Sequence, residues 1–223
     1  MLDQLTYFQH YIERVKRLVG QEKTNHILAK GLAIVVAGSN DLAITYYGQG
    51  AQSLIYDVDY FTSVMANSAA SFVMQLYGYG ARQIAVIGAP PLGCTPSQRT
   101  LKGGLLRNCA QDLNYASQLF NAKLSITLDQ LAKTLPNSNL IFIDMYSPFS
   151  DILKNPQDYG FEEIKKGCCG TGLVEAGPLC NRFTTSVCSN ISSYIFWDSF
   201  HPTQRFYKSL TKILFDRYIH RLS

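Results

Sequence analysis

Three short apolar runs constrain the fold of this chain more than any other feature. They cover residues 32–37, 83–88 and 140–144, and they are rich in Val, Ile and other apolar residues. A continuous apolar run of this length is typical of a strand buried on both faces of a parallel sheet. Helix-length segments separate the runs. The sequence therefore predicts an α/β fold in which helices cover both faces of a parallel sheet.

The segments around these strands carry helical periodicity. Apolar residues recur at steps of three and four along residues 58–76, 109–135 and 203–222, and we expect a short helix over residues 148–154. A similar stripe near the N-terminus is expected to end at Gly20, and it consists of Leu5, Phe8, Ile12, Val15 and Leu18. Residues 155–194 show little periodicity, so the sequence predicts a long ordered loop there.

Length, composition and charge narrow the class of protein. A chain of 223 residues with 47% hydrophobic and 16% charged residues is typical of one globular domain, which we expect to span residues 1–223. The formal net charge of +4 is modest and its Lys and Arg residues are scattered, which disfavours a nucleic-acid partner. No run of eighteen apolar residues occurs, so no transmembrane segment is predicted.

The six cysteines favour disulfides over a metal site. Zinc sites favour Cys pairs that are two to four residues apart, and neither the adjacent Cys168 and Cys169 nor the pair Cys180 and Cys188 fits that spacing. We expect Cys94 to pair with Cys109 as the most local disulfide, and the other four cysteines to tie down the long loop. No metal ion is expected.

An even cysteine count and one glycosylation sequon, Asn190-Ile191-Ser192, suggest an oxidising compartment. The N-terminus, by contrast, has a helical stripe rather than the apolar core of a signal peptide. The compartment suggested by the cysteines and the character of the N-terminus therefore disagree.

An Asp and a His three residues apart, Asp198 and His201, lie just before Pro202 and the last expected helix. In a Ser-His-Asp hydrolase the His takes and returns a proton, while the Asp fixes its tautomer and stabilises the imidazolium. An isolated Asp-x-x-His is also compatible with local backbone hydrogen bonding and with packing beside the helix. The motif therefore needs support from elsewhere in the chain.

A second polar stretch, Gly38-Ser39-Asn40-Asp41, follows the first expected strand. Functional sites of parallel sheets lie at the carboxyl ends of strands, although such a stretch is also an ordinary turn. In the functional interpretation the Asn40 amide donates a hydrogen bond to a developing oxyanion, an interaction worth about 3 kcal/mol in known cases. Gly38 allows the close backbone turn that this requires.

Five stretches together resemble the GDSL esterases/lipases of the SGNH hydrolase superfamily, and in particular their plant extracellular-lipase branch. In chain order they are residues 38–41, 89–94, 167–172, 196–198 and 198–202. The resemblance runs from end to end of the chain. It implies a flavodoxin-like three-layer α/β/α sandwich, a Ser-His-Asp triad, secretion, and no metal or organic cofactor.

The resemblance also implies a role for each matching residue. His201 is expected to act as general base and then acid, Asp198 to orient it, and Asn40 to donate to the oxyanion with Gly38 supporting its turn. The implied reaction is hydrolysis of an acyl or lipid ester through an acyl-enzyme.

The chain departs from the family at the nucleophile, because no Gly-Asp-Ser and no Gly-x-Ser-x-Gly occurs in its 223 residues. We therefore expect that the first strands of the family and its nucleophile block are missing, that the chain alone is inactive, and that one flank of the strand at residues 32–37 is exposed. Two serines are candidate substitutes for the missing nucleophile: Ser39, beside Asn40, and Ser199. Ser199 is too close in the chain to reach His201 Nε2 while Asp198 holds Nδ1. The alternative is a non-catalytic protein that binds acyl esters or a protein partner.

Overall fold

The computed structural model describes residues 2–48, 51–180 and 186–222. Its central feature is a parallel sheet with strand order β1-β2-β3, formed by β1 (Leu32–Val36), β2 (Gln83–Ile87) and β3 (Asn139–Ile143). The register places Ile34 beside Ala85, and Ala85 beside Ile141. The three predicted strands are confirmed with ends that differ by one residue.

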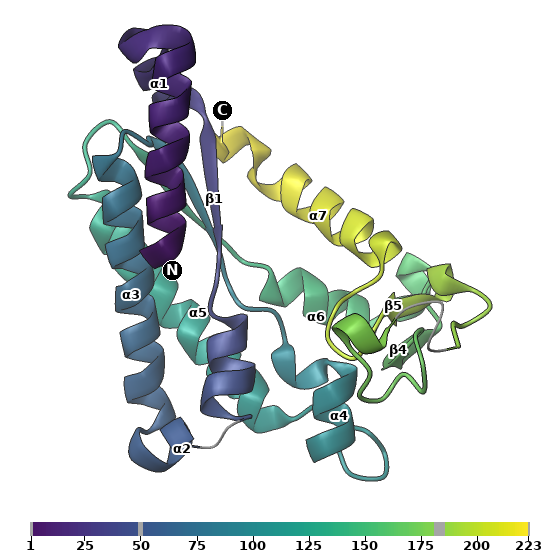
Figure 1. Ribbon diagram of the computed structural model, residues 1–223. Helices are drawn as coiled ribbons and strands as arrows, with labels where there is room; N and C mark the ends of the chain where they lie inside the picture. Colours follow the sequence, from purple (N-terminus) through teal and green to yellow (C-terminus); the bar gives the residue numbers. More distant parts are fainter. Residues whose placement is uncertain (1, 49–50, 181–185, 223) are drawn as a thin grey trace.

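Three helices lie on one side of this sheet: α1 (Leu2–Lys30), α3 (Val58–Gly78) and α5 (Gln111–Ala132). Their buried side chains form one core with Val35, Ile84 and Val86 from the sheet (Figure 1). The expected end of the first helical segment at Gly20 is confirmed, because α1 is two helical segments joined by a kink at this residue. Gly20 leaves helical geometry (φ 81°, ψ 169°), and a second helical segment, which was not predicted, continues to Lys30.

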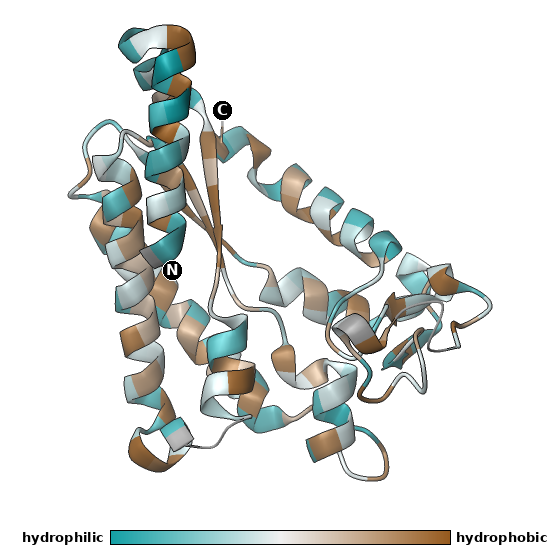
Figure 2. Ribbon diagram, in the orientation of Figure 1, coloured by the Kyte–Doolittle hydropathy of each residue, from teal (hydrophilic) through white to brown (hydrophobic). Residues whose placement is uncertain are grey.

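The opposite face is covered by α7 (Gln204–Leu222), whose Tyr218 packs with Ala85, Ile141 and Ile143. Helices therefore cover both faces, as predicted. Because α7 packs on β2 and β3, it leaves one face of β1 uncovered. Figure 2 shows that β1 is a mainly hydrophobic strand.

The prediction that the first strand is buried on both faces is wrong for β1. Leu32, Ile34 and Val36 are 42%, 58% and 64% exposed, whereas Val35 between them is buried. The strand is also at the edge of the described sheet. The expected exposed flank is thus present among the described residues.

A second, two-stranded parallel sheet of β4 (Glu163–Gly167) and β5 (Tyr194–Phe196) corrects the prediction of a long loop. The segment Glu-Ile-Lys-Lys-Gly that forms β4 is too polar and too short to show a strand pattern. Short 3-10 turns complete the region at Pro156–Tyr159, Gly177–Leu179 and Ile191–Ser193.

Several short elements connect the main ones. The expected helix near residue 148 is α6 (Tyr146–Lys154). Four further elements were not predicted, because each is too short to show a period: a π-helix at Asp41–Tyr46, α2 (Ala51–Ile55), a 3-10 turn at Leu92–Cys94, and α4 (Pro96–Lys102). No helix in the described ranges is long and apolar enough to cross a membrane.

All six cysteines form disulfides: Cys94–Cys109, Cys168–Cys188 and Cys169–Cys180. The expected local pair is confirmed, and so is the prediction that the other four cysteines tie down the region before β5. The Cys168–Cys188 and Cys169–Cys180 disulfides link the residues that follow β4 to the segment that precedes β5.

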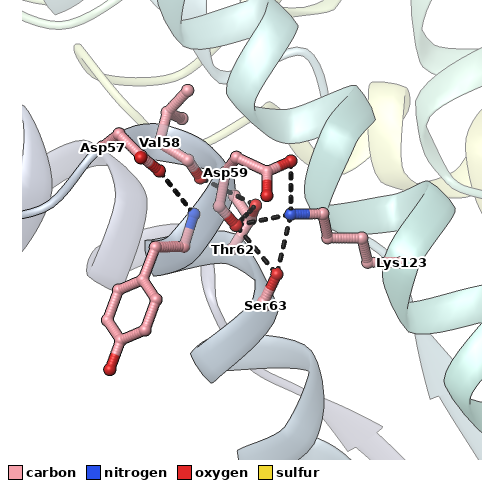
Figure 3. A network of polar contacts seen from close by, with 7 residues as sticks. Asp57, Val58, Asp59, Thr62, Ser63 and Lys123 are labelled. Atoms are coloured by element: carbon pink, nitrogen blue, oxygen red, sulfur yellow. Dashed lines mark hydrogen bonds and ion pairs between the residues drawn. The ribbon is translucent and has the colours of Figure 1, made fainter.

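A polar network fixes α3 against α5 (Figure 3). Asp57 caps α3 by accepting from Tyr60 N at 2.7 Å. From α5, Lys123 Nζ reaches Asp59 Oδ1 at 2.8 Å and Ser63 Oγ at 2.8 Å, and it also bonds the Asp59 carbonyl. The two helices that support the carboxyl end of β1 are therefore joined by charge-assisted bonds as well as by apolar packing.

Candidate active site

The Asp-x-x-His motif forms a tight reversal after β5. Trp197 N donates to His201 O at 2.8 Å, and two residues further out Thr203 N donates to Ile195 O at 2.8 Å. The chain therefore doubles back on β5 before α7 begins. This reversal brings both side chains of the motif to the same side of a rigid support.

Asp198 and His201 are bonded to each other. The Asp198 Oδ2 atom lies 2.8 Å from His201 Nδ1, while Oδ1 accepts from Phe200 N at 2.8 Å and from His201 N at 2.6 Å. Asp198 is 3% exposed, whereas the His201 side chain is 66% exposed. A buried carboxylate thus holds an imidazole that faces solvent.

The pKa of Asp198 shows which protonation state this arrangement favours. Burial raises the pKa, but the hydrogen bonds from His201 and Phe200 outweigh it and hold the pKa below its ordinary value. Since the ionised carboxylate only accepts, neutral His201 carries its proton on Nδ1 and presents Nε2 as the basic nitrogen. This is the tautomer that a general base requires.

The backbone of residues 167–172 packs against the chain that carries the Asp-x-x-His motif and bonds to it. Cys168 N donates to Phe196 O at 3.0 Å and Cys169 N to Trp197 O at 2.9 Å. A Cβ at Gly167 would lie 2.8 Å from the Asp198 carbonyl carbon, so only glycine fits this close approach. The adjacent cysteines are thus part of the backbone ladder that holds the reversal.

One cavity of about 270 Å³ brings three of the candidate residues together, whereas Asp198 and Gly38 do not line it. His201 lines it with Asn40 and Ser39, from the carboxyl end of β1. Its remaining wall is mainly apolar and consists of Val36, Ala43, Ile44, Pro90, Pro91, Leu92, Thr95, Met145, Phe149, Phe200, Pro202, Tyr207 and Leu210. A mostly apolar cavity with a few polar groups is typical of a small-molecule site.

Gly38 has the backbone conformation that its predicted role requires, with φ of 104°, and Leu42 N donates to its carbonyl at 3.1 Å. A Cβ there would meet Met65 and Phe120 at 3.1 Å. Asn40 precedes the π-helix, and its side chain makes no hydrogen bond that caps this helix.

The two candidate substitute nucleophiles differ in position. Ser39 lines the cavity with His201. Ser199 is fully buried and is not among the residues that line the cavity, and its Oγ has no hydrogen-bond partner within the described part of the chain. Its backbone is held between Glu175 O, at 2.9 Å from Ser199 N, and Ser97 N, at 3.0 Å from Ser199 O.

Sequence reasoning missed most of the cavity wall. Residues 90–92 belong to one of the five family-like stretches, at residues 89–94. Their place in this stretch was the one sequence signal that could have indicated a position in the cavity wall. Tyr207 is on α7, where its helical periodicity gave no hint of a site. Burial, and then the nearby charge of Asp198, raise the pKa of Tyr207.

A three-layer α/β fold whose strand ends carry an Asp–His pair and an amide side chain around one cavity is typical of acyl hydrolases. The chain matches the model of the GDSL-like lipase/acylhydrolase family over residues 1–214, and it belongs to this family.

Plant proteins resemble the chain closely. A GDSL esterase/lipase of Arabidopsis thaliana (At1g20120) is 60% identical over 95% of this chain and 53% of its own length. The anther-specific proline-rich protein APG of the same plant is 58% identical over all of this chain and 43% of its own length. GDSL esterase/lipase EXL3 is 52% identical over 98% of this chain and 60% of its own length. The chain spans about half the length of the curated relatives that it matches.

Proposed function

We propose that residues 1–223 carry the proton-transfer part of an acyl ester hydrolase. The observation that carries this proposal is the 2.8 Å bond between buried Asp198 and exposed His201 at a cavity that Asn40 also lines. His201 Nε2 takes a proton from the attacking hydroxyl and returns it to the leaving group, while Asp198 stabilises the imidazolium. The Asn40 amide donates to the oxyanion, and the apolar wall receives the acyl group of a small-molecule or lipid ester.

We further propose that the nucleophilic serine comes from a segment outside these 223 residues, which pairs along the free edge of β1. Three observations support this: the chain contains no Gly-Asp-Ser, β1 has exposed apolar side chains and no partner strand on one edge within the described residues, and β1 ends at the cavity with Val36. The 223 residues alone are then inactive, because losing the nucleophile costs about as much as losing the whole triad.

Labelling by a fluorophosphonate probe, which reacts with an activated serine, tests this proposal. We expect no labelling of the 223-residue chain. Adding the N-terminal segment of a relative, in cis or as a separate fragment, should produce labelling that His201→Ala abolishes and His26→Ala, at an exposed position on α1, leaves intact. One probe per chain attached to Ser39 in the chain alone would overturn the proposal.

Asn40 is tested in the same reconstituted protein. Removing one oxyanion donor costs about 10²–10³-fold in kcat, so Asn40→Ala should lower kcat by that amount and leave KM nearly unchanged. Asn67→Ala, on α3, is the control. A change in KM alone would assign Asn40 to substrate binding.

The second candidate function is non-catalytic binding of an acyl ester. Two observations favour it: the cavity is mainly apolar, and the 223 residues contain no Gly-Asp-Ser. A fluorescent acyl ester that is retained without turnover, even after reconstitution, would support it. A protein partner in place of an ester remains a variant of this candidate.

We propose secretion and glycosylation on separate grounds. Asn190 is exposed, and its Oδ1 accepts from Ser192 N at 3.2 Å, so the sequon forms an accessible turn. Three disulfides are typical of an oxidising compartment. Recovery of the protein from the culture medium tests secretion. A loss of mass after glycosidase treatment, absent in Asn190→Gln, tests glycosylation at this residue.

A further inference from the structure

Glu175, which has no role in the proposed chemistry, accepts five hydrogen bonds through its carboxylate from residues 171–174. Its Oε1 accepts from Thr171 N at 3.0 Å and from Thr171 Oγ1 at 2.8 Å. Its Oε2 accepts from Leu173 N and Val174 N, both at 3.3 Å, and again from Thr171 Oγ1 at 2.9 Å. One carboxylate therefore organises the backbone of the whole turn at residues 171–174.

Two glycines of the same stretch are required by close approaches, and one of them makes room for this carboxylate. Gly170 has φ of 67°, and a Cβ there would lie 2.7 Å from Glu175 Cδ. Gly172 has φ of 73°, and a Cβ there would lie 2.3 Å from Gly167 O. Both positions combine a left-handed backbone with a close approach, so both require glycine. The Glu175 carboxylate thus explains the glycine at residue 170, whereas Gly172 is required by its close approach to the Gly167 backbone.

The charge of Glu175 is strongly favoured. Burial raises its pKa, but the hydrogen bonds from Thr171 and Val174 outweigh this and lower the pKa to about 2. The carboxylate is thus ionised at every pH at which an esterase would work, and it acts as a constant acceptor.

The backbone of Glu175 reaches the Asp–His turn directly. Its carbonyl accepts from Ser199 N at 2.9 Å, and Ser199 is the residue that follows Asp198. Two residues further along, Gly177 N approaches Asp198 Oδ2 at 3.5 Å. The Cys169–Cys180 disulfide closes the loop that contains Glu175, and Cys169 N in turn donates to Trp197 O. The side chain of Glu175 therefore holds the loop at residues 171–174, and its backbone carbonyl connects this loop to the turn that carries Asp198 and His201.

We propose that Glu175 is a positioning residue, which holds the Asp198 carboxylate where it can accept a hydrogen bond from His201 Nδ1–H. The proposal rests on the function proposed above for Asp198 and His201. Replacing the carboxylate by an amide would place an NH₂ group against N–H and O–H donors, since the groups of Thr171, Leu173 and Val174 that bond to the carboxylate all donate. The loop would then shift and carry the Ser199 contact with it.

The tautomer of His201 is the measurement that separates positioning from support of the fold, and it needs no activity. Ring ¹⁵N NMR shifts distinguish Nδ1–H from Nε2–H, with His201→Asn used to assign the signals. We expect the Nδ1–H form in the unmodified chain, because Asp198 accepts at that nitrogen. Asp198→Ala gives the shift for complete loss of the acceptor.

Glu175→Gln should move the tautomer equilibrium of His201 at least several-fold towards Nε2–H. Glu163→Gln is the matched control: Glu163 Oε1 also accepts from two backbone amides, Lys165 N at 2.7 Å and Lys166 N at 3.1 Å, but on β4 and away from the turn. Glu163→Gln should leave the tautomer unchanged even where it lowers the melting temperature by a similar amount.

If Glu175→Gln fails to fold, Thr171→Val replaces it, because this variant removes only the hydroxyl donor and should give a smaller shift in the same direction. Equal His201 tautomers in the unmodified chain and in the folded variant would overturn the proposal. Probe labelling that fails after reconstitution would instead count against the proposed hydrolase, and the NMR result would stand apart from it.

Discussion

The two parts of the candidate site are held in different ways. Asp198 and His201 lie on a reversal bonded to a small sheet, cross-linked by two disulfides and framed by the Glu175 loop. Asn40 and Ser39 follow β1, an edge strand whose outer side chains are exposed, and they depend on the packing of Gly38 against α3 and α5. We call the first the cross-linked half and the second the edge half.

The difference separates what is preorganised from what is not. A general base must be oriented before the reaction, and the cross-linked half fixes the His201 ring through backbone bonds, a buried carboxylate and covalent bridges. The edge half carries its polar side chains beside β1, which has a partner strand on only one side among the described residues, and another strand can extend an edge of this kind. Perturbations should therefore affect the stability of the cross-linked half and of the edge half by different routes.

The largest expected effect is on the cross-linked half. Replacing Cys169 and Cys180 together by Ala should lower the free energy of unfolding by about 2–5 kcal/mol, since a disulfide limits the entropy of the unfolded chain. Urea unfolding followed by Trp197 fluorescence measures this at the reversal itself, because Trp197 is the single tryptophan of the chain. A loss below 1 kcal/mol would show that hydrogen bonds alone hold this half.

The second effect concerns the edge half. The 223-residue chain is expected to self-associate through β1, and Ile34→Lys should raise the monomer fraction several-fold by placing a charge on the free edge. Ile126→Lys on α5 is the matched control, because Ile34 and Ile126 are both 58% exposed but only Ile34 is on a strand. Sedimentation velocity measures the monomer fraction. Equal gains from both variants would attribute association to general hydrophobicity.

The same division explains what could be predicted from the sequence. The strands at residues 83–88 and 140–144 are apolar runs because helices cover both their faces, so local pattern and tertiary burial agree. The run at residues 32–37 has the same pattern but is open on one face, because burial depends on a neighbour that the pattern does not specify. The polar strand β4 is stabilised by its partner and by disulfides, so its sequence shows no period.

The candidate site divides in a similar way. Asp198, His201 and Asn40 could be proposed because each belongs to a short motif with a chemical purpose. Glu175 and Tyr207 could not, because their places near the site depend on the folded path of the backbone. Glu175 accepts from backbone N–H groups of its own loop, and Tyr207 lines the cavity from α7.

The third prediction is a pH dependence of the cross-linked half. Glu175 and Asp198 both have folded pKa values below their ordinary values, about 2 in the case of Glu175. Groups with lowered pKa values stabilise the fold above the ordinary carboxyl pKa, roughly 4, and lose that contribution as the pH falls. Trp197 emission should therefore change between about pH 4 and pH 2, before the helical circular dichroism signal of α3 and α5 is lost. Glu175→Gln should reduce the difference in unfolding free energy between pH 7 and pH 3, and an unchanged difference would contradict the assignment.

The smallest expected effect concerns Ser199, inside the same reversal. Its backbone is bonded on both sides, while its buried hydroxyl has no partner among the described residues. A buried polar group without a hydrogen bond costs free energy, so Ser199→Ala should leave stability unchanged or raise it by up to about 1 kcal/mol. Ser193→Ala is the control, because that buried hydroxyl donates to Asn190 O at 3.0 Å and its loss should lower stability by about 1 kcal/mol. Urea unfolding of both variants gives the comparison. A loss of stability in Ser199→Ala as large as that in Ser193→Ala would mean that the Ser199 hydroxyl has a partner in solution, and that the reversal depends on side-chain bonds as well as on its backbone ladder and disulfides.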